Sequence, residues 1–250
     1  MAKGASIRFK SYKETVQKLL DILQLHRELK KYDKIILKPN LAMYQEESTP
    51  KEFAEEVVKF CLIHKNPVAE IFIVEGGDGY ETADLFEAYG YKTLAEKYGV
   101  GLIDLNEAET EQIENEKFLK FPEIIYPKIL REGMLISITR LSESDETGIS
   151  GAISTMLGAF PSTYYSGFFS QGKNKIRKWP IKYSIHDIVR CKVPEFAIVD
   201  ASKHGQILAG LPFEIDKQSA KLLGKEWQEI PYLKLLDDYL TEDRVEEIEE

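Results

Sequence analysis

The sequence is poor in the residues that build metal centres, and it lacks the motifs of several large enzyme classes. Its 250 residues include only two cysteines, Cys61 and Cys191, and four histidines. No C-x-x-C pair is present, so the chain alone cannot supply a zinc ribbon or the cysteine run of an iron–sulfur cluster. Neither a G-x-S-x-G elbow nor a P-loop occurs, which disfavours a serine hydrolase and a Walker-type NTPase. We therefore expect no iron–sulfur cluster in this chain.

Long apolar runs and an excess of positive charge are also missing. No segment reaches 18 apolar residues, and the first residues lack the apolar core of a signal peptide. The net charge of −9 opposes a nucleic-acid surface, because binding to phosphates needs positive charge. Two isolated cysteines are typical of buried free thiols in a reducing compartment. We predict a soluble, cytoplasmic protein with no membrane partner and no nucleic-acid partner.

The residues that are present describe a globular chain, with 43% hydrophobic and 30% charged residues. Short apolar strands are predicted at residues 33–38, 69–74 and 101–105, with helices at 49–64 and 82–98 between them. This alternation is typical of βαβ units, which place their strands parallel in one sheet. The predicted fold is a single α/β domain over residues 1–250, with a mainly parallel central sheet, helices on both faces and an acidic tail at 241–250.

The chain is organised around residues 134–161. They begin as an apolar strand at 134–138 and continue as a polar run to Thr147. Small residues from Gly148 to Leu157 then predict a helix. A strand that leads through a loop to a helix N-terminus is where open α/β sheets bind ligands. We therefore expect the site at the carboxyl ends of the strands.

Two cations follow predicted strands and are candidate anion ligands. Lys38 and Asn40 come after the first strand, where a lysine acts as a point charge for phosphate or carboxylate. The alternative is a turn built by Pro39 with a solvated lysine. Arg140 ends the central strand, although the acidic residues at 143–146 are equally available to pair with it.

The glycine-rich turn at 75–79 is the second candidate element. Its amides could cradle an anion, and the carboxylates of Glu75 and Asp78 are candidate ligands for a divalent metal ion such as magnesium. The turn does not match the G-x-G-x-x-G fingerprint, so a dinucleotide site is only weakly indicated. The alternative is a plain tight turn with its acidic side chains in solvent.

Histidines and a basic loop complete the candidates. His186 and His204, together with Asp200 and Asp216, are the donor types of a transition-metal site, although a lone histidine is more often structural. The basic loop at 172–182 could close over a negatively charged substrate or could simply be solvated. No catalytic residue and no metal-ligand set are assigned. The candidate ligand-binding residues are Lys38, Asn40, Glu75, Gly76, Gly77, Asp78, Arg140, Thr147, Gly148, His186, Asp200, Lys203 and His204.

Several short motifs occur in the order of a known family. They are Lys38-Pro39-Asn40, Gly77-Asp78, Asp104-Leu105-Asn106, Thr147-Gly148, His186, Asp200 and Leu208-Ala209-Gly210. Over residues 33–225 the chain resembles the family catalogued as domain of unknown function 362 (DUF362). The family's central segment usually reads Lys-Leu-Lys-x-His before Thr-Gly, with Lys-Asn further along. This chain has Arg140, Ser142 and Ser144, then Ser154 and Thr155, so it resembles a divergent member.

The resemblance also bears on partners and function. Many members are joined to ferredoxin-like modules, which this sequence lacks, so the resemblance implies an iron–sulfur protein as a partner. We predict that the chain binds a small metabolite carrying phosphate or carboxylate, with or without turnover. Lys38 and Arg140 are expected to converge on it with the amides of residues 76–79 and the helix starting near Gly148. The alternative is a catalytically inactive member that acts as a scaffold or regulatory interaction protein.

Overall fold

A seven-stranded sheet forms the middle of the molecule, and the computed structural model describes residues 3–239 of the chain. The predicted acidic tail at 241–250 lies outside the described residues. Five neighbouring strands, from β10 to β4, are parallel to one another. Near one edge, β11 runs antiparallel to both of its neighbours, β10 and β1. In sheet order the strands are β1 (Gly4–Arg8), β11 (Gln206–Gly210), β10 (Phe196–Ala201), β7 (Met134–Arg140), β2 (Lys34–Lys38), β3 (Glu70–Glu75) and β4 (Gly101–Asp104). The predicted single-domain α/β fold is confirmed.

The three early strands lie side by side, as the sequence predicts. Ile35 of β2 is in register with Ile71 of β3, and Phe72 of β3 with Gly101 of β4. From β2 the sheet grows through β3 and β4 on one side and through β7 and β10 on the other. The chain therefore reverses its direction across the sheet between β2 and β7. In open α/β sheets such a reversal leaves a crevice at the carboxyl ends of the strands.

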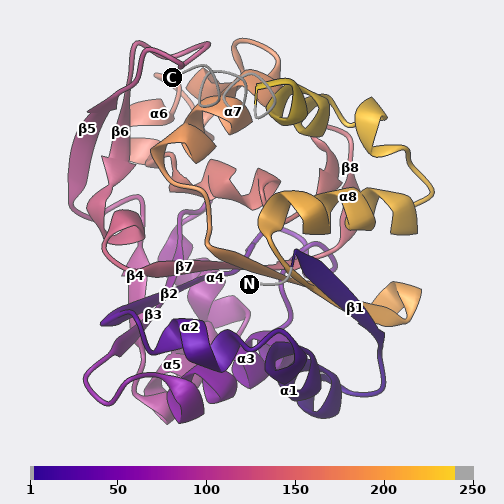
Figure 1. Cartoon of the computed structure of the whole chain (residues 1–250). Helices are drawn as coiled ribbons and strands as arrows, with labels where there is room; N and C mark the ends of the chain where they lie inside the picture. The colour runs from indigo at the N-terminus through magenta and orange to yellow at the C-terminus, as the bar shows by residue number, and fades with distance from the viewer. Residues whose placement is uncertain (1–2, 240–250) are drawn as a thin grey trace, which may run out of the picture.

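One face of the sheet is covered by the helices from the first part of the chain, drawn below the sheet in Figure 1. Their apolar stripes pack on β2 and β3, with Val16, Phe53 and Val57 fully buried. The Ser11 hydroxyl caps the first helix by accepting a hydrogen bond from the Glu14 backbone. The helices are α1 (Tyr12–Ile22), α2 (Leu25–Leu29), α3 (Lys51–His64), α4 (Thr82–Ala88) and α5 (Tyr91–Tyr98).

The opposite face is covered by later segments, drawn above the sheet in Figure 1. They are the helices α6 (Ser162–Tyr165), α7 (Ile181–Cys191) and α8 (Pro212–Leu222), the hairpin of β5 (Thr110–Glu114) and β6 (Glu123–Pro127), and a helix over residues 231–239. Ile36, Val74 and Leu135 point from the sheet into this second core. No helix in the described part of the chain is both long and apolar enough to cross a membrane.

The prediction of a helix from Gly148 to Leu157 is wrong. Residues Gly148–Ser150 form a strand, β9, that pairs antiparallel with β8 (Ser142–Ser144), and a 3-10 helix follows at Ser154–Ala159. Gly148 has φ of 85°, which an α-helix does not accept but a tight hairpin does. Small residues in this segment serve close packing rather than helix formation. Gly151, for example, lies against the Asp216 carboxylate, and a Cβ there would come within 2.5 Å of Oδ1.

Candidate functional site

Two cavities open at the carboxyl ends of β2 and β7, and the chain after β2 lines both. The larger has a volume of about 560 Å³ and is bordered by residues 40–44, the turn after β3 and the β8–β9 hairpin. The smaller, of about 340 Å³, lies between Arg140 at the end of β7 and the first residues of α3. The edge at which the sequence predicts a site therefore carries two separate cavities.

The larger cavity is acidic. Arg177 is the one basic side chain among its described lining residues, whereas six carboxylates line it: Glu47, Glu75, Asp78, Glu143, Asp145 and Glu146. Hydroxyl groups of the β8–β9 hairpin and of Ser154 and Thr155 supply further polar surface. Such a lining suits hydroxyl-bearing or cationic groups better than the anion that the sequence predicted.

Lys38 forms a buried ion pair with Glu75. Its side chain is 0% exposed, and its Nζ lies 2.8 Å from Oε1 of Glu75. Glu75 also accepts hydrogen bonds from the backbone N–H groups of Gly76 and Leu41. The pair ties the end of β2 to the end of β3. The predicted role of Lys38 as a free charge is therefore not what the geometry offers.

The amides and carboxylates of the glycine-rich turn also have their hydrogen-bond partners within the protein. The Gly76 amide donates to Glu75, and the Gly77 amide donates to the Thr82 hydroxyl at 3.0 Å. Asp78 accepts from the Lys173 amide at 2.7 Å and pairs with Arg177 at 2.8 Å. Both carboxylates proposed as magnesium ligands are thus engaged. The described residues contain no group of three or more acidic, histidine or cysteine side chains arranged to hold a metal ion.

Lys173 anchors the basic loop to this turn. Its side chain is fully buried and donates to the carbonyl oxygens of Gly76 at 2.8 Å and Gly158 at 3.1 Å. Burial lowers the pKa of Lys173 to about 8. Gly158 fits between the charged groups because it has no side chain: a Cβ would lie 2.4 Å from Oε1 of Glu75. The start of the predicted loop is therefore a fixed wall rather than a free lid.

Arg140 faces the smaller cavity and is held by the end of the neighbouring strand. Its Nε lies 3.3 Å from Oδ2 of Asp200, and its side chain is 17% exposed. Asp200 also accepts hydrogen bonds from the Tyr12 hydroxyl at 2.8 Å and the Ser202 amide at 3.0 Å. Burial, together with the charge of Asp200, raises the pKa of Tyr12. The acidic residues at 143–146, considered from the sequence as partners of Arg140, pair elsewhere: Glu143 with Lys225 and Glu146 with Arg177.

Two residues at the smaller cavity and its border, Lys51 and Tyr12, are absent from the predicted site. Lys51 lines the smaller cavity beside Arg140 and makes no hydrogen bond or ion pair within residues 3–239. A signal for it was present, since Thr49-Pro50 marks a helix start directly after the loop that follows β2. Tyr12 had no such signal, because its contact with Asp200 joins residues 188 positions apart.

Two further predicted residues, Asn40 and Thr147, belong to the lining of the larger cavity. Asn40 lines the larger cavity and holds the 40–49 loop closed through Thr49 and Glu47. Thr147 is buried and donates to the Ile149 carbonyl at 2.8 Å.

The proposed histidine site does not form among the described residues. His186 is buried in α7, where its Nδ1 lies 2.8 Å from Asp187. Lys203 and His204 are exposed on the turn after β10. Asp216 accepts hydrogen bonds from the amides of Ala152 and Ile153, and burial raises its pKa to about 6. These side chains therefore lie on different elements and have different partners, so they do not form a common metal site among the described residues.

The fold and the two cavities define an α/β protein with its candidate site at the carboxyl edge of a mainly parallel sheet. The model of the family described as "Domain of unknown function (DUF362)" matches residues 35–206. The chain belongs to this family, as its motifs predict. No curated protein matches the sequence.

Proposed function

We propose that the protein binds a small metabolite through a phosphate or carboxylate group placed in the smaller cavity. The observation that carries this proposal is the pair of cations there. Arg140 and Lys51 both line the cavity, and Glu52 is the carboxylate among its described lining residues. Among the lining residues the positive charges therefore outnumber the negative ones, whereas the whole chain carries −9. An anion at this position would form charge-assisted hydrogen bonds to both side chains.

The start of α3 supports the same ligand chemistry. This helix of 14 residues begins at Lys51, and its N-cap residue, Pro50, offers no side-chain acceptor to the first turn. The first amides of a helix point out of its end and carry partial positive charge. In the smaller cavity they add to the charges of Arg140 and Lys51.

The protein contacts of Arg140 orient its guanidinium but leave some of its N–H donors free. Asp200 binds Nε, and Nη1 makes only a long contact of 3.5 Å with the Gln45 carbonyl. The guanidinium therefore keeps donors that can reach a ligand. A volume of about 340 Å³ is near the lower end for ligand pockets, so the ligand would be small.

The test compares Lys51→Gln with Lys30→Gln. Lys30 is an exposed lysine at the end of α2, shortly before the amino end of β2. Phosphorylated and carboxylated metabolites are screened by thermal shift, and hits are measured by calorimetry. The parent and Lys30→Gln should bind equally. Lys51→Gln should bind at least tenfold more weakly, about 1.4 kcal/mol, with unchanged folding because Lys51 has no partner to lose. The proposal fails if no anion stabilises the parent, or if the two variants bind alike.

A scaffold or regulatory role without turnover is the second candidate. It is supported by the position of Lys38, whose ammonium group is enclosed with Glu75 and cannot contact a substrate while that pair is intact. If no metabolite binds in the screen, this second function takes precedence.

We also propose that the protein acts in the cytoplasm. Both cysteines are free, and burial raises the pKa of each thiol to about 12. Thiols held in this protonated state are unreactive. A reducing compartment is where such cysteines are ordinarily found.

A further inference from the structure

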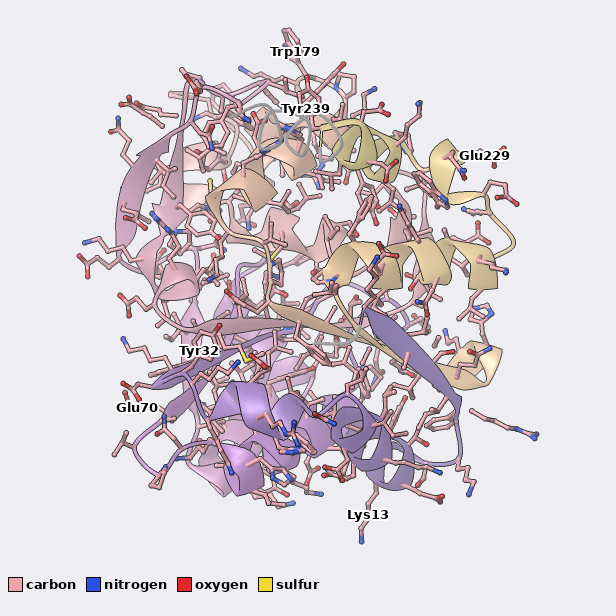
Figure 2. All side chains as sticks on the ribbon, viewed as in Figure 1. Lys13, Tyr32, Glu70, Trp179, Glu229 and Tyr239 are labelled. Atoms are coloured by element: carbon pink, nitrogen blue, oxygen red, sulfur yellow. The ribbon has the colours of Figure 1, made fainter. Side chains whose placement is uncertain are left out.

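The segment after α6 carries two aromatic side chains that lie almost wholly in solvent. Phe168 and Phe169 are each 96% exposed, and their ring centroids are 4.9 Å apart. No other large apolar side chain in residues 3–239 is as exposed. Trp179, 61% exposed, projects from the surface further along the same segment (Figure 2). Adjacent exposed rings of this kind mark a contact surface rather than ordinary solvent-facing residues.

The base of this segment is fixed, so the rings are held out from the protein. Lys173 and Ile176 are fully buried, and the Lys173 amide binds Asp78. Arg177 pairs with Asp78 at 2.8 Å and with Glu146 at 2.7 Å. The Phe168–Phe169 tip therefore extends from an anchored support at the rim of the larger cavity.

The segment that carries the tip, residues 164–182, contains lysines and an arginine but no carboxylate. Lys175, Lys178 and Lys182 have no carboxylate partner in the described residues: Lys175 donates to the Tyr164 carbonyl, and Lys182 lies over the Tyr183 ring. Asp78 and Glu146, the two carboxylates that form ion pairs with the segment within residues 3–239, are both paired with Arg177. The segment thus differs in sign from the chain as a whole, which carries −9.

We propose that residues 164–182 dock on an anionic lipid bilayer, with Phe168 and Phe169 inserted at the interface and the lysines against the headgroups. Aromatic rings are favoured at the membrane–water interface, and lysines are attracted to anionic lipids. The absence of a long apolar run predicts no membrane-spanning segment, but a peripheral contact of two residues needs no such run.

The area of the tip favours a bilayer over a protein partner. Two phenylalanine rings bury roughly 300–500 Å² together, whereas a stable protein interface takes about 800 Å² from each partner. A bilayer needs no complementary pocket for a protruding tip. The net negative charge of the protein does not prevent this contact, because physiological salt screens charges beyond about 8 Å.

The test is co-sedimentation with vesicles of phosphatidylcholine alone and of phosphatidylcholine with phosphatidylglycerol. The parent should bind the anionic vesicles, and less at high salt. The variant Phe168→Ser/Phe169→Ser should partition at least tenfold less, about 1.4 kcal/mol, with an unchanged melting temperature. Val68→Ser serves as the matched control, since Val68 is also exposed but precedes β3 at the opposite edge of the sheet. Lys175→Glu/Lys178→Glu should lose binding to the anionic vesicles at low salt.

Three results would overturn the proposal. The first is a parent protein that binds neither kind of vesicle. The second is a double phenylalanine variant that binds as well as the parent or Val68→Ser. The third is a concentration-dependent oligomer in light scattering that the double phenylalanine variant abolishes, because this would assign the tip to contact between copies of the chain.

Discussion

Removing the Lys38 side chain should destabilise the fold strongly, even though lysine substitutions are usually mild. The Lys38–Glu75 pair joins β2 to β3, and both side chains are almost completely excluded from water. The change Lys38→Met keeps the length and the apolar stem of the side chain. It removes the cation that lies 2.8 Å from Oε1 of Glu75 and leaves the carboxylate buried without that ion pair.

The magnitude follows from the burial of the partner. Breaking a buried ion pair by removing one member typically costs about 3–5 kcal/mol, because the remaining charge stays desolvated. The two amides that donate to Glu75, from Gly76 and Leu41, place the cost near the lower end of that range. Replacing both charges is often nearly neutral, so Lys38→Met/Glu75→Gln should recover at least half of the loss.

The measurement is urea unfolding at pH 7 followed by circular dichroism, on the parent, both single variants and the double variant. Lys34→Met is the control, since Lys34 begins the same strand but pairs with Glu132 at the surface. It should cost less than about 1 kcal/mol. A structural role for the buried pair is contradicted if Lys38→Met costs no more stability than Lys34→Met, or if the double variant is as unstable as Lys38→Met.

Further predictions concern one lysine, one glycine and the cysteines. Burial lowers the pKa of Lys173 to about 8, so the folded chain releases this proton before the unfolded chain does. The parent should therefore gain stability relative to Lys173→Met as the pH rises from 8 towards 10.5, by at most about 1.4 kcal/mol per unit. An unchanged difference in pH-dependent urea unfolding contradicts this. Gly148→Ala should cost about 1–2 kcal/mol in thermal unfolding, because φ is 85° and the new Cβ would lie 3.0 Å from Ile230; an unchanged melting temperature would show that the hairpin adapts. Protein purified without oxygen should contain no stoichiometric iron or sulfide, since Cys61 and Cys191 pack in cores on opposite faces of the sheet; elemental analysis that finds both would contradict this.

The architecture was readable from the sequence because its signals are local. Apolar runs such as the one ending at Leu37 are short and bounded by polar turns, and strands, helices and their order follow from such patterns. Parallel pairing follows from the crossover lengths, so β2, β3 and β4 could be placed in one sheet. The segment after Thr147 was misread for the same reason. Small residues look helical in isolation, whereas the pairing of β8 with β9 and the contact of Gly151 with Asp216 appear only in the folded chain.

The sequence by itself indicated a candidate site at the carboxyl edge of the sheet, with Lys38 and Arg140 at the ends of strands in one parallel sheet. Tertiary structure alone decided which charges remain available. Lys38 forms an ion pair with Glu75, which lies 37 residues further along the chain, so its charge is balanced within the protein. Arg140 keeps free N–H donors and lines the smaller cavity together with Lys51. The physical reason is that strand and helix patterns arise between near neighbours, whereas the free energy of a buried charge depends on partners brought together only by folding.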